Sequence, residues 1–290
     1  MANLKEVRIR IESVKSTMQI TSAMKMVSAA KLRRAQNAIQ DMRPYAQKLG
    51  DVLASLTSSL SGDESPFAQE RKVDTVLIVA INSNRGLCGG FNSSVVKRTK
   101  VLIQEYSDKK VEVLGIGKKS REAFRDSEHV AQGFPKSHDE LYGDLSFENV
   151  GKVADMIMER YASEEVDKVI LVYNRFKNAA VQILQTEEYL PVPQPEQTEE
   201  NTHSIDFILE PSREEIIKEI IPSSLRVQLF KALLDSHASE HGARMTAMHK
   251  ATDNADDILK ELKLSYNKAR QAAITGEILE IVGGAEALNN

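Results

Sequence analysis

Two long terminal segments that lack helix-breaking residues constrain the fold of this 290-residue chain more than any other feature. Between Leu4 and Met42 there is neither Gly nor Pro, and apolar residues recur at alternating spacings of three and four, the heptad pattern of a coiled coil. This seam consists of Leu4, Val7, Ile11, Val14, Met18, Thr21, Lys25, Ser28, Leu32, Ala35, Ile39 and Met42. Its three polar members stand together in the middle, so that section packs thinly or faces something other than the partner helix.

The C-terminal segment is a second long helix of matching length. Pro222 suits the first turn of a helix, nothing from Ser223 to Val282 is proline, and Gly283 with Gly284 supplies a stop signal. Each terminal helix would be about 85–90 Å long, at about 1.5 Å per residue. Because the chain between them must return, the simplest pairing is antiparallel. Pro44 is expected to kink or interrupt the first helix. Small residues late in the second helix would allow close approach of the two backbones: Ala269, Ala272, Ala273 and Gly276.

The central part of the chain has the pattern of a parallel sheet. Residues 75–82, 111–116 and 168–173 are short β-branched apolar runs, which are typical of buried parallel strands. Helical stretches at 93–106, 118–126 and 147–162 separate them and predict a small Rossmann-like sheet. Residues 180–186 follow closely enough to pair with the third strand as a hairpin, and 205–209 could add an edge strand.

The predicted fold class is therefore α/β plus coiled coil, with a long antiparallel coiled coil of the terminal helices and a central Rossmann-like α/β domain. We expect an N-terminal coiled-coil helix at 1–60, the α/β domain at 61–210 and a C-terminal coiled-coil helix at 211–290.

Composition narrows the class of protein. Charged residues make up 28% of the chain and aromatic residues 5%, a profile that suits long solvated helices. The single cysteine, Cys88, excludes a disulfide within the chain and fits a reducing compartment. No apolar run approaches the roughly 20 residues that a membrane-spanning helix needs, and the N-terminus lacks an apolar signal core. We expect an intracellular protein whose attachment to a membrane is indirect.

Charge is spread unevenly along the chain. Residues 1–50 hold ten Lys and Arg residues against three acids, whereas residues 187–219 hold ten acids against two basic residues. A face exposed to solvent explains each block of like charge as well as a binding partner does. If the basic block has a partner, an acidic protein surface is favoured over nucleic acid, because Tyr45 is its only aromatic residue.

The turns after the predicted strands argue against a nucleotide site. Gly86, Gly89 and Gly90 do not match the dinucleotide pattern G-x-G-x-x-G. A phosphate-binding loop after the second strand would need Gly at 112 and Ser or Thr at 119, where the chain has Glu and Lys. These glycines are better explained by backbone geometry and close packing, and Cys88 by packing as a small apolar residue.

One motif suggests a metal. His237, Glu240 and His241 form H-x-x-E-H, the spacing of the inverted zinc peptidases. His249 lies about 12 Å further along the axis, too far to complete a site. An exposed coiled-coil helix also offers no cleft for a substrate, so we do not expect zinc here.

Several blocks of the sequence resemble the gamma subunit of bacterial F-type ATP synthase. They are "ITSAMKMVSAAKLRRAQ" (20–36), "RGLCGGFN" (85–92), "ASEHGARMTAMHKATDNA" (238–255), "LSYNKARQAA" (264–273) and "ITGEILEIVGGA" (274–285). They cover both terminal helices and the central domain. In that family the turn after the first strand usually has Asp where this chain has Asn84, which leaves the local hydrogen bonding open.

The resemblance implies a central rotor shaft that couples ion-driven rotation of the c-ring to ATP synthesis or hydrolysis in a ring of three alpha and three beta subunits. It implies no catalytic residue, cofactor or metal in this chain, and a peripheral position on the cytoplasmic face of the bacterial membrane. The epsilon subunit and the c-ring would contact the α/β domain, near Glu210. Six positions match contacts with the beta subunit: Met24, Lys25, Arg244, Arg270, Gln271 and Thr275.

Two other functions remain to be weighed: a nucleotide-dependent enzyme built on the Rossmann-like domain, and a basic coiled coil that binds nucleic acid.

Overall fold

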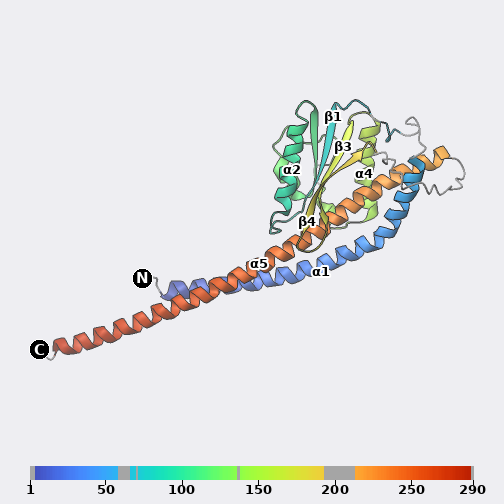
Figure 1. Cartoon of the computed structure of the whole chain (residues 1–290). Coiled ribbons are helices and arrows are strands. Elements are labelled where there is room, and N and C mark those ends of the chain that lie inside the picture. The colour runs from blue at the N-terminus through green and yellow to red at the C-terminus, as the bar shows by residue number, and fades with distance from the viewer. Residues whose placement is uncertain (1–3, 58–65, 70, 136–137, 193–212, 289–290) are drawn as a thin grey trace. The chain divides into compact units, whose positions relative to one another are not determined.

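The computed structural model describes residues 4–57, 66–69, 71–135, 138–192 and 213–288 (Figure 1). In chain order the elements are α1 (Leu4–Thr57), β1 (Thr75–Ile81), α2 (Phe91–Glu105), β2 (Lys110–Ile116), α3 (Lys118–Phe124), the 3-10 turn η1 (Asp139–Tyr142), α4 (Phe147–Ala162), β3 (Lys168–Phe176), β4 (Gln182–Leu190) and α5 (Arg213–Leu288). Two long terminal helices thus flank a central mixed sheet, and the predicted fold class is confirmed.

The chain divides into two compact units. One comprises Met1–Ser28 with Met245–Asn290, and the other comprises Ala29–Arg244. We call the first the helical unit and the second the sheet unit. The three-part division at residues 60 and 210 stays a prediction.

The sheet has the strand order β2-β1-β3-β4. β1 pairs in parallel with β2 and with β3, while β4 runs antiparallel to β3. The four predicted strands are confirmed, including the hairpin, with β3 and β4 extending to Phe176 and Leu190. The predicted edge strand at 205–209 lies outside the described residues. The predicted helices correspond to α2, α3 and α4.

The strands are nearly continuous apolar runs because the sheet is covered on both faces. Val76, Ile78 and Ala80 of β1 point toward α2, whereas Leu77, Val79 and Ile81 point toward α4 and α5. Figure 1 shows α2 on one face of the sheet and α4 on the other.

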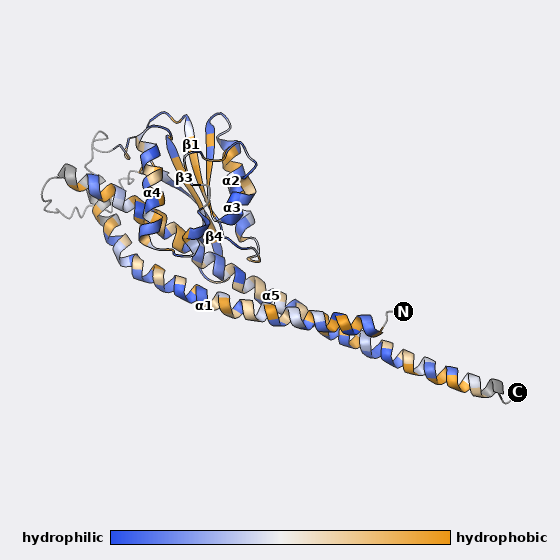
Figure 2. Ribbon diagram, turned by 180° about the vertical axis from the view of Figure 1, so that it is seen from behind, coloured by the Kyte–Doolittle hydropathy of each residue, from blue (hydrophilic) through white to orange (hydrophobic). Residues whose placement is uncertain are grey.

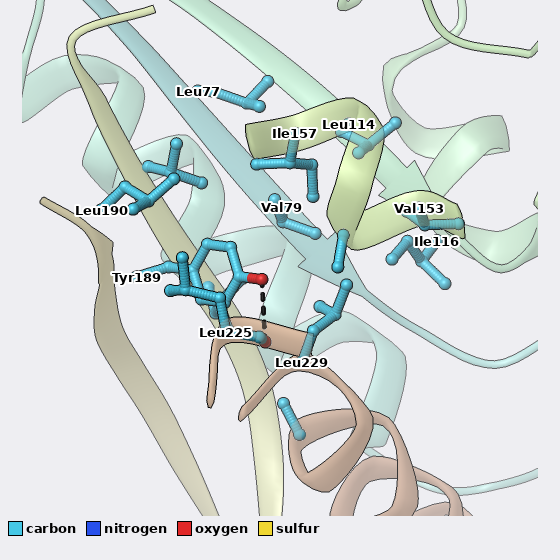
Figure 3. Close-up of a cluster of buried hydrophobic side chains, with 14 of the residues drawn as sticks. Leu77, Val79, Leu114, Ile116, Val153, Ile157, Tyr189, Leu190, Leu225 and Leu229 are labelled. Carbon is cyan, nitrogen blue, oxygen red and sulfur yellow. Dashed lines mark hydrogen bonds between the residues drawn. The ribbon is translucent and has the colours of Figure 1, made fainter. Parts of the chain in front are cut away.

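α5 completes the second face, a role that was not predicted from the sequence. α5 has an almost fully buried apolar residue at every fourth position over this stretch: Ile221, Leu225, Leu229 and Leu233. These residues belong to the same hydrophobic cluster as Leu77 and Val79. The hydroxyl of Tyr189 in β4 donates to the carbonyl oxygen of Leu225 at 2.9 Å, as Figure 3 shows. This part of α5 is therefore a core helix of the sheet unit.

Two helix boundaries differ from the expectation. Pro222 lies inside α5 rather than in its first turn, because the helix begins at Arg213. A proline inside a helix removes one hydrogen bond and costs about 3 kcal/mol, which the burial of Ile221 and Leu225 on either side helps to offset. α5 also continues through Gly283 and Gly284 to Leu288. Neither glycine adopts the positive φ that a helix stop requires.

The heptad seam of α1 is confirmed. All twelve seam positions are buried or half-buried, and α1 continues through Pro44 to Thr57. The expected close approach at Ala272 and Ala273 is wrong, because both side chains are exposed. Figure 2 shows hydrophobic residues recurring along α5 to its C-terminal end.

Candidate functional site

The polar middle of the α1 seam is matched by polar residues of α5 within the helical unit. The Thr252 hydroxyl lies 2.8 Å from the Thr21 hydroxyl, and Nζ of Lys25 lies 3.3 Å from Nδ1 of His249. Since position 21 faces 252 and position 25 faces 249, the helices are antiparallel here. We call these four residues the polar section.

Lys25 reaches His249 from a half-buried seam position. An ammonium group only donates hydrogen bonds, so the imidazole nitrogen accepts. Met24 beside it is half-buried, whereas Met26 and Val27 expose 65% and 58% of their surface. Apolar side chains this exposed mark a surface suited to a partner. His249 and Thr252 were not identified from the sequence as the partners of the polar seam residues. They stand three residues apart, and the seam residues that they face, Thr21 and Lys25, stand four apart.

The end of α5 presents the other predicted contact residues to solvent. Arg270, Gln271 and Thr275 are all exposed, and the Thr275 hydroxyl donates to the carbonyl oxygen of Gln271 at 2.9 Å. Extrapolated from the two pairs of the polar section, Leu4 at the start of α1 faces position 269 or 270. The following turns of α5 carry five exposed aliphatic side chains: Ile274, Ile278, Leu279, Ile281 and Val282. Glu210 lies outside the described residues.

Arg244 has a different environment from the other predicted contact residues. It is 8% exposed and forms an ion pair with Glu240 at 2.6 Å. Its guanidinium also donates to the carbonyl oxygens of Arg85, at 3.0 Å, and Gly86, at 3.3 Å, in the turn after β1. The hydrogen bonds of Arg244 therefore join α5 to the turn after β1. Contact between Arg244 and a partner stays a prediction, and the burial of this side chain does not support it.

The two histidines of the H-x-x-E-H motif form a pair beside Arg244, in which His241 is buried and His237 is half-buried. Their Nε2 atoms are 2.8 Å apart, so one donates and the other accepts. Burial lowers the pKa of His237 to about 4 and that of His241 to about 3, and the positive charges of Lys31 and Arg244 contribute. Both rings are therefore neutral near pH 7. The expectation that this motif lies on an exposed helix is wrong, because α5 is buried here against the sheet unit.

Metal-binding chemistry finds little support at this pair. Among the residues that the structure describes, no group of three or more His, Cys, Asp or Glu side chains is arranged to hold a metal ion. Burial raises the pKa of Glu240 more than Arg244 lowers it, and Arg244 occupies its carboxylate. Two fixed cations near the rings would also oppose a bound cation.

In many Rossmann-like folds a nucleotide binds at the turn after β1. In this protein the polar side chains of that turn bind other groups of the turn itself. The Ser83 hydroxyl donates to the carbonyl oxygen of Arg85 at 2.7 Å, and the Asn92 amide lies 3.2 Å from the sulfur of Cys88. Cys88 is buried, as expected, and burial raises the pKa of its thiol. Arg244 binds two carbonyl oxygens of the same turn. These polar atoms of the turn are therefore engaged in hydrogen bonds within the protein.

Asn84 joins three segments of the sheet unit. Its side-chain nitrogen donates to the carbonyl oxygen of Asp139 at 2.7 Å, and its side-chain oxygen accepts from the backbone N–H of Lys118 at 2.9 Å. An aspartate could accept the second bond but could not donate the first while ionised. The amide therefore fits this turn, in which it both donates and accepts a hydrogen bond.

Close packing requires a glycine at Gly117, which follows β2. Its φ is +91°, and an added Cβ would lie 2.1 Å from the carbonyl oxygen of Asn82. Both the backbone conformation and the lack of space exclude other residues.

No helix among the described residues is long and apolar enough to cross a membrane.

Comparison with known proteins covers the whole chain. A family model described as ATP synthase matches residues 3–288. The ATP synthase gamma chain of Flavobacterium johnsoniae is 57% identical over 290 residues, and that of Christiangramia forsetii is 55% identical over 291, with 100% of both chains covered in each case. The fold is similar to that of a chain in the rotor of Euglena gracilis mitochondrial ATP synthase, with a TM-score of 0.63, 22% identity, and coverage of 93% of this chain and 98% of that one. The chain therefore belongs to the ATP synthase gamma chain family.

Proposed function

We propose that this chain is the central rotor shaft of an F-type ATP synthase, which couples ion-driven rotation of the c-ring to ATP synthesis or hydrolysis. The observation that carries the proposal is the similarity to ATP synthase gamma chains along the entire length of both sequences. Two long helices, of which α5 ends in exposed aliphatic side chains, are consistent with a shaft that turns inside other subunits.

The proposed shaft performs no chemistry of its own. The groups that sequence patterns suggested for catalysis are engaged in internal bonds. Cys88 is buried, the two histidines are neutral and bind each other, and the polar side chains of the turn after β1 bind within the turn. What a shaft supplies instead is a contact free energy that differs among the beta subunits as it turns, which shifts each one between states of different affinity.

The proposed partners are three alpha and three beta subunits, the epsilon subunit and the c-ring. Met24, Lys25, Arg270, Gln271 and Thr275 are the proposed contacts with the beta subunits, and their partial or full exposure agrees with this role. Arg244 and Glu210 remain predictions, the first because it is buried and the second because it lies outside the described residues. We place the protein at the cytoplasmic face of the bacterial membrane, held there by its partners.

Reassembly tests the proposal. Purified chain mixed with the alpha and beta subunits should yield a stoichiometric ATPase complex. That complex, joined to the membrane part, should pump ions when given ATP. A chain that neither enters the complex nor restores ATP-driven pumping would contradict the proposal.

The two other functions have their own measurements. Stoichiometric binding of ATP or NAD to the chain by itself in equilibrium dialysis would favour an enzyme. Retention on DNA that falls steeply with salt would favour a nucleic-acid binder. The family match favours neither.

A further inference from the structure

One imidazole nitrogen in the polar section lies between a cation and an anion. Nδ1 of His249 is 3.3 Å from Nζ of Lys25 on α1 and 3.5 Å from Oδ1 of Asp253, one turn further along α5. Lys25 is the charged group that α1 brings to this ring, and Asp253 is the one that its own helix supplies. The His249 side chain is 55% exposed, so protons reach it freely.

Protonation of the ring changes which neighbour this nitrogen can bind. Toward Lys25, which only donates, Nδ1 must offer its lone pair, and the ring proton is then on Nε2. A second proton occupies Nδ1, ends the bond to Lys25 and places a positive charge beside the ammonium. The new N–H can then donate to the carboxylate of Asp253, at the i, i+4 spacing that favours ion pairs on a helix.

We propose that His249 is a proton-controlled switch for Lys25, in which the neutral ring holds the ammonium against α5 and the protonated ring releases it toward a partner's carboxylate. Histidine is the side chain type that ordinarily gains or loses a proton between pH 5 and 8. The role of the released ammonium rests on the proposed function, in which Lys25 meets an acidic surface of the beta subunit. The switch itself is a property of the helical unit.

Amine labelling of the full-length chain tests the switch directly. The extent of labelling of Lys25 is measured by mass spectrometry relative to Lys15, an exposed lysine of the same helix, between pH 8 and pH 5.5. In the wild type the Lys25 to Lys15 ratio should rise about twofold as the pH falls, the size expected for an exposed charged pair. In His249→Gln, whose side-chain oxygen still accepts a hydrogen bond but takes no proton, the ratio should stay flat.

Two further variants make the test decisive. Asp253→Asn removes the carboxylate that stabilises the protonated ring, so the rise should move to lower pH. His249→Asn provides a second ring-free variant if His249→Gln loses helical circular dichroism. The same ratio in the wild type and the ring-free variants at every pH would overturn the switch.

The switch and the proposed function fail in different measurements. If the labelling ratio responds to pH but Lys25→Glu leaves rotational coupling intact, the contact with the beta subunit is wrong and the switch stands. If Lys25→Glu uncouples but the ratio does not depend on His249, the proposed contact stands and the switch is wrong.

Discussion

The hydroxyl of Thr252 on α5 lies 2.8 Å from the hydroxyl of Thr21 on α1, at a seam position where a coiled coil ordinarily has an apolar residue. Each hydroxyl is also within hydrogen-bond distance of a carbonyl oxygen of its own helix, that of Met18 or Met248. The polar seam position is therefore satisfied from both helices, and the bond fixes one register between them.

We expect a double-mutant cycle at this pair to show coupling. Thr21→Val or Thr252→Val alone leaves the remaining hydroxyl with only the carbonyl oxygen of its own helix, and the lost bond between the helices should lower the free energy of unfolding by about 1 kcal/mol. The double variant replaces both hydroxyls by methyl groups of the same shape and should be close to wild type. Thermal unfolding followed by circular dichroism measures all four proteins, and strictly additive losses would contradict the coupling.

Lys25→Glu should weaken coupling without preventing assembly. The substitution replaces attraction by repulsion at the proposed contact with an acidic surface, worth about 1–3 kcal/mol depending on desolvation. ATP hydrolysis by the reassembled complex should persist, ATP-driven pumping per ATP should fall, and high salt should partly restore it.

Lys25→Met is the matched control, because it keeps the length of the side chain without its charge. It should assemble at least as well as the wild type. If Lys25→Glu instead unfolds the helical unit while Lys25→Met strongly stabilises it, Lys25 is only an unfavourable seam residue.

The histidine pair should hold no zinc. Both rings are neutral near pH 7, yet their Nε2 atoms bind each other and the cations of Lys31 and Arg244 are close. Chelators should leave the ATPase activity of the reassembled complex unchanged, for the wild type and for His237→Ala with His241→Ala alike. Metal analysis that finds one zinc per wild-type chain, absent from the double variant, would show this interpretation to be wrong.

Asp235 should give a measurable dependence of stability on pH. Burial raises its pKa to about 6, against the attraction of Lys231, Arg175 and Arg43. Because the folded state binds this proton more tightly than the unfolded state, the residue destabilises the fold above about pH 6, and the penalty disappears as the pH falls toward 4.

Asp235→Asn removes that penalty while keeping an oxygen for the backbone N–H of Phe176. At pH 7.5 the variant should be more stable than the wild type by about 1–2 kcal/mol, and the difference should shrink as the pH falls. Urea unfolding at a series of pH values measures this. A difference that is constant from pH 7.5 to 4 would refute the assignment.

Gly117→Ala should be far more damaging than Gly89→Ala. Both glycines have positive φ, but an added Cβ at Gly117 meets the Asn82 carbonyl oxygen, whereas nothing lies within 4 Å of a Cβ at Gly89. We expect Gly89→Ala to cost about 1 kcal/mol through backbone strain alone and Gly117→Ala several times more. Equal melting temperatures for the two variants would contradict this comparison.

The sheet was predictable because its strands are separate apolar runs, each bounded by polar or glycine-containing turns. The seam of α1 was predictable for a similar reason, since a heptad repeat is a local pattern. Both follow from spacing along the chain alone.

The packing of α5 on the sheet was not predicted, although a signal was present. Between Ile221 and Leu234 apolar residues occupy more than one face of the helix, which indicates that the helix packs against other elements on more than one side. The prediction rested on the length of the helix alone, so it did not include the burial of Arg244 and His241. Which polar residues of α5 face Thr21 and Lys25 depends on the register between two distant segments, and no local pattern fixes that register.

The position of Gly242 determines how rigidly the sheet unit can transmit force. A Cβ there would lie 3.3 Å from both the Cα and the carbonyl oxygen of Ala179, so the turn between β3 and β4 rests almost directly on the backbone of α5. Two residues further along α5, Arg244 donates hydrogen bonds to the turn after β1. Under the proposed function, a torque that a partner applies to the sheet would enter α5 through backbone contact at Gly242 and through the buried guanidinium of Arg244.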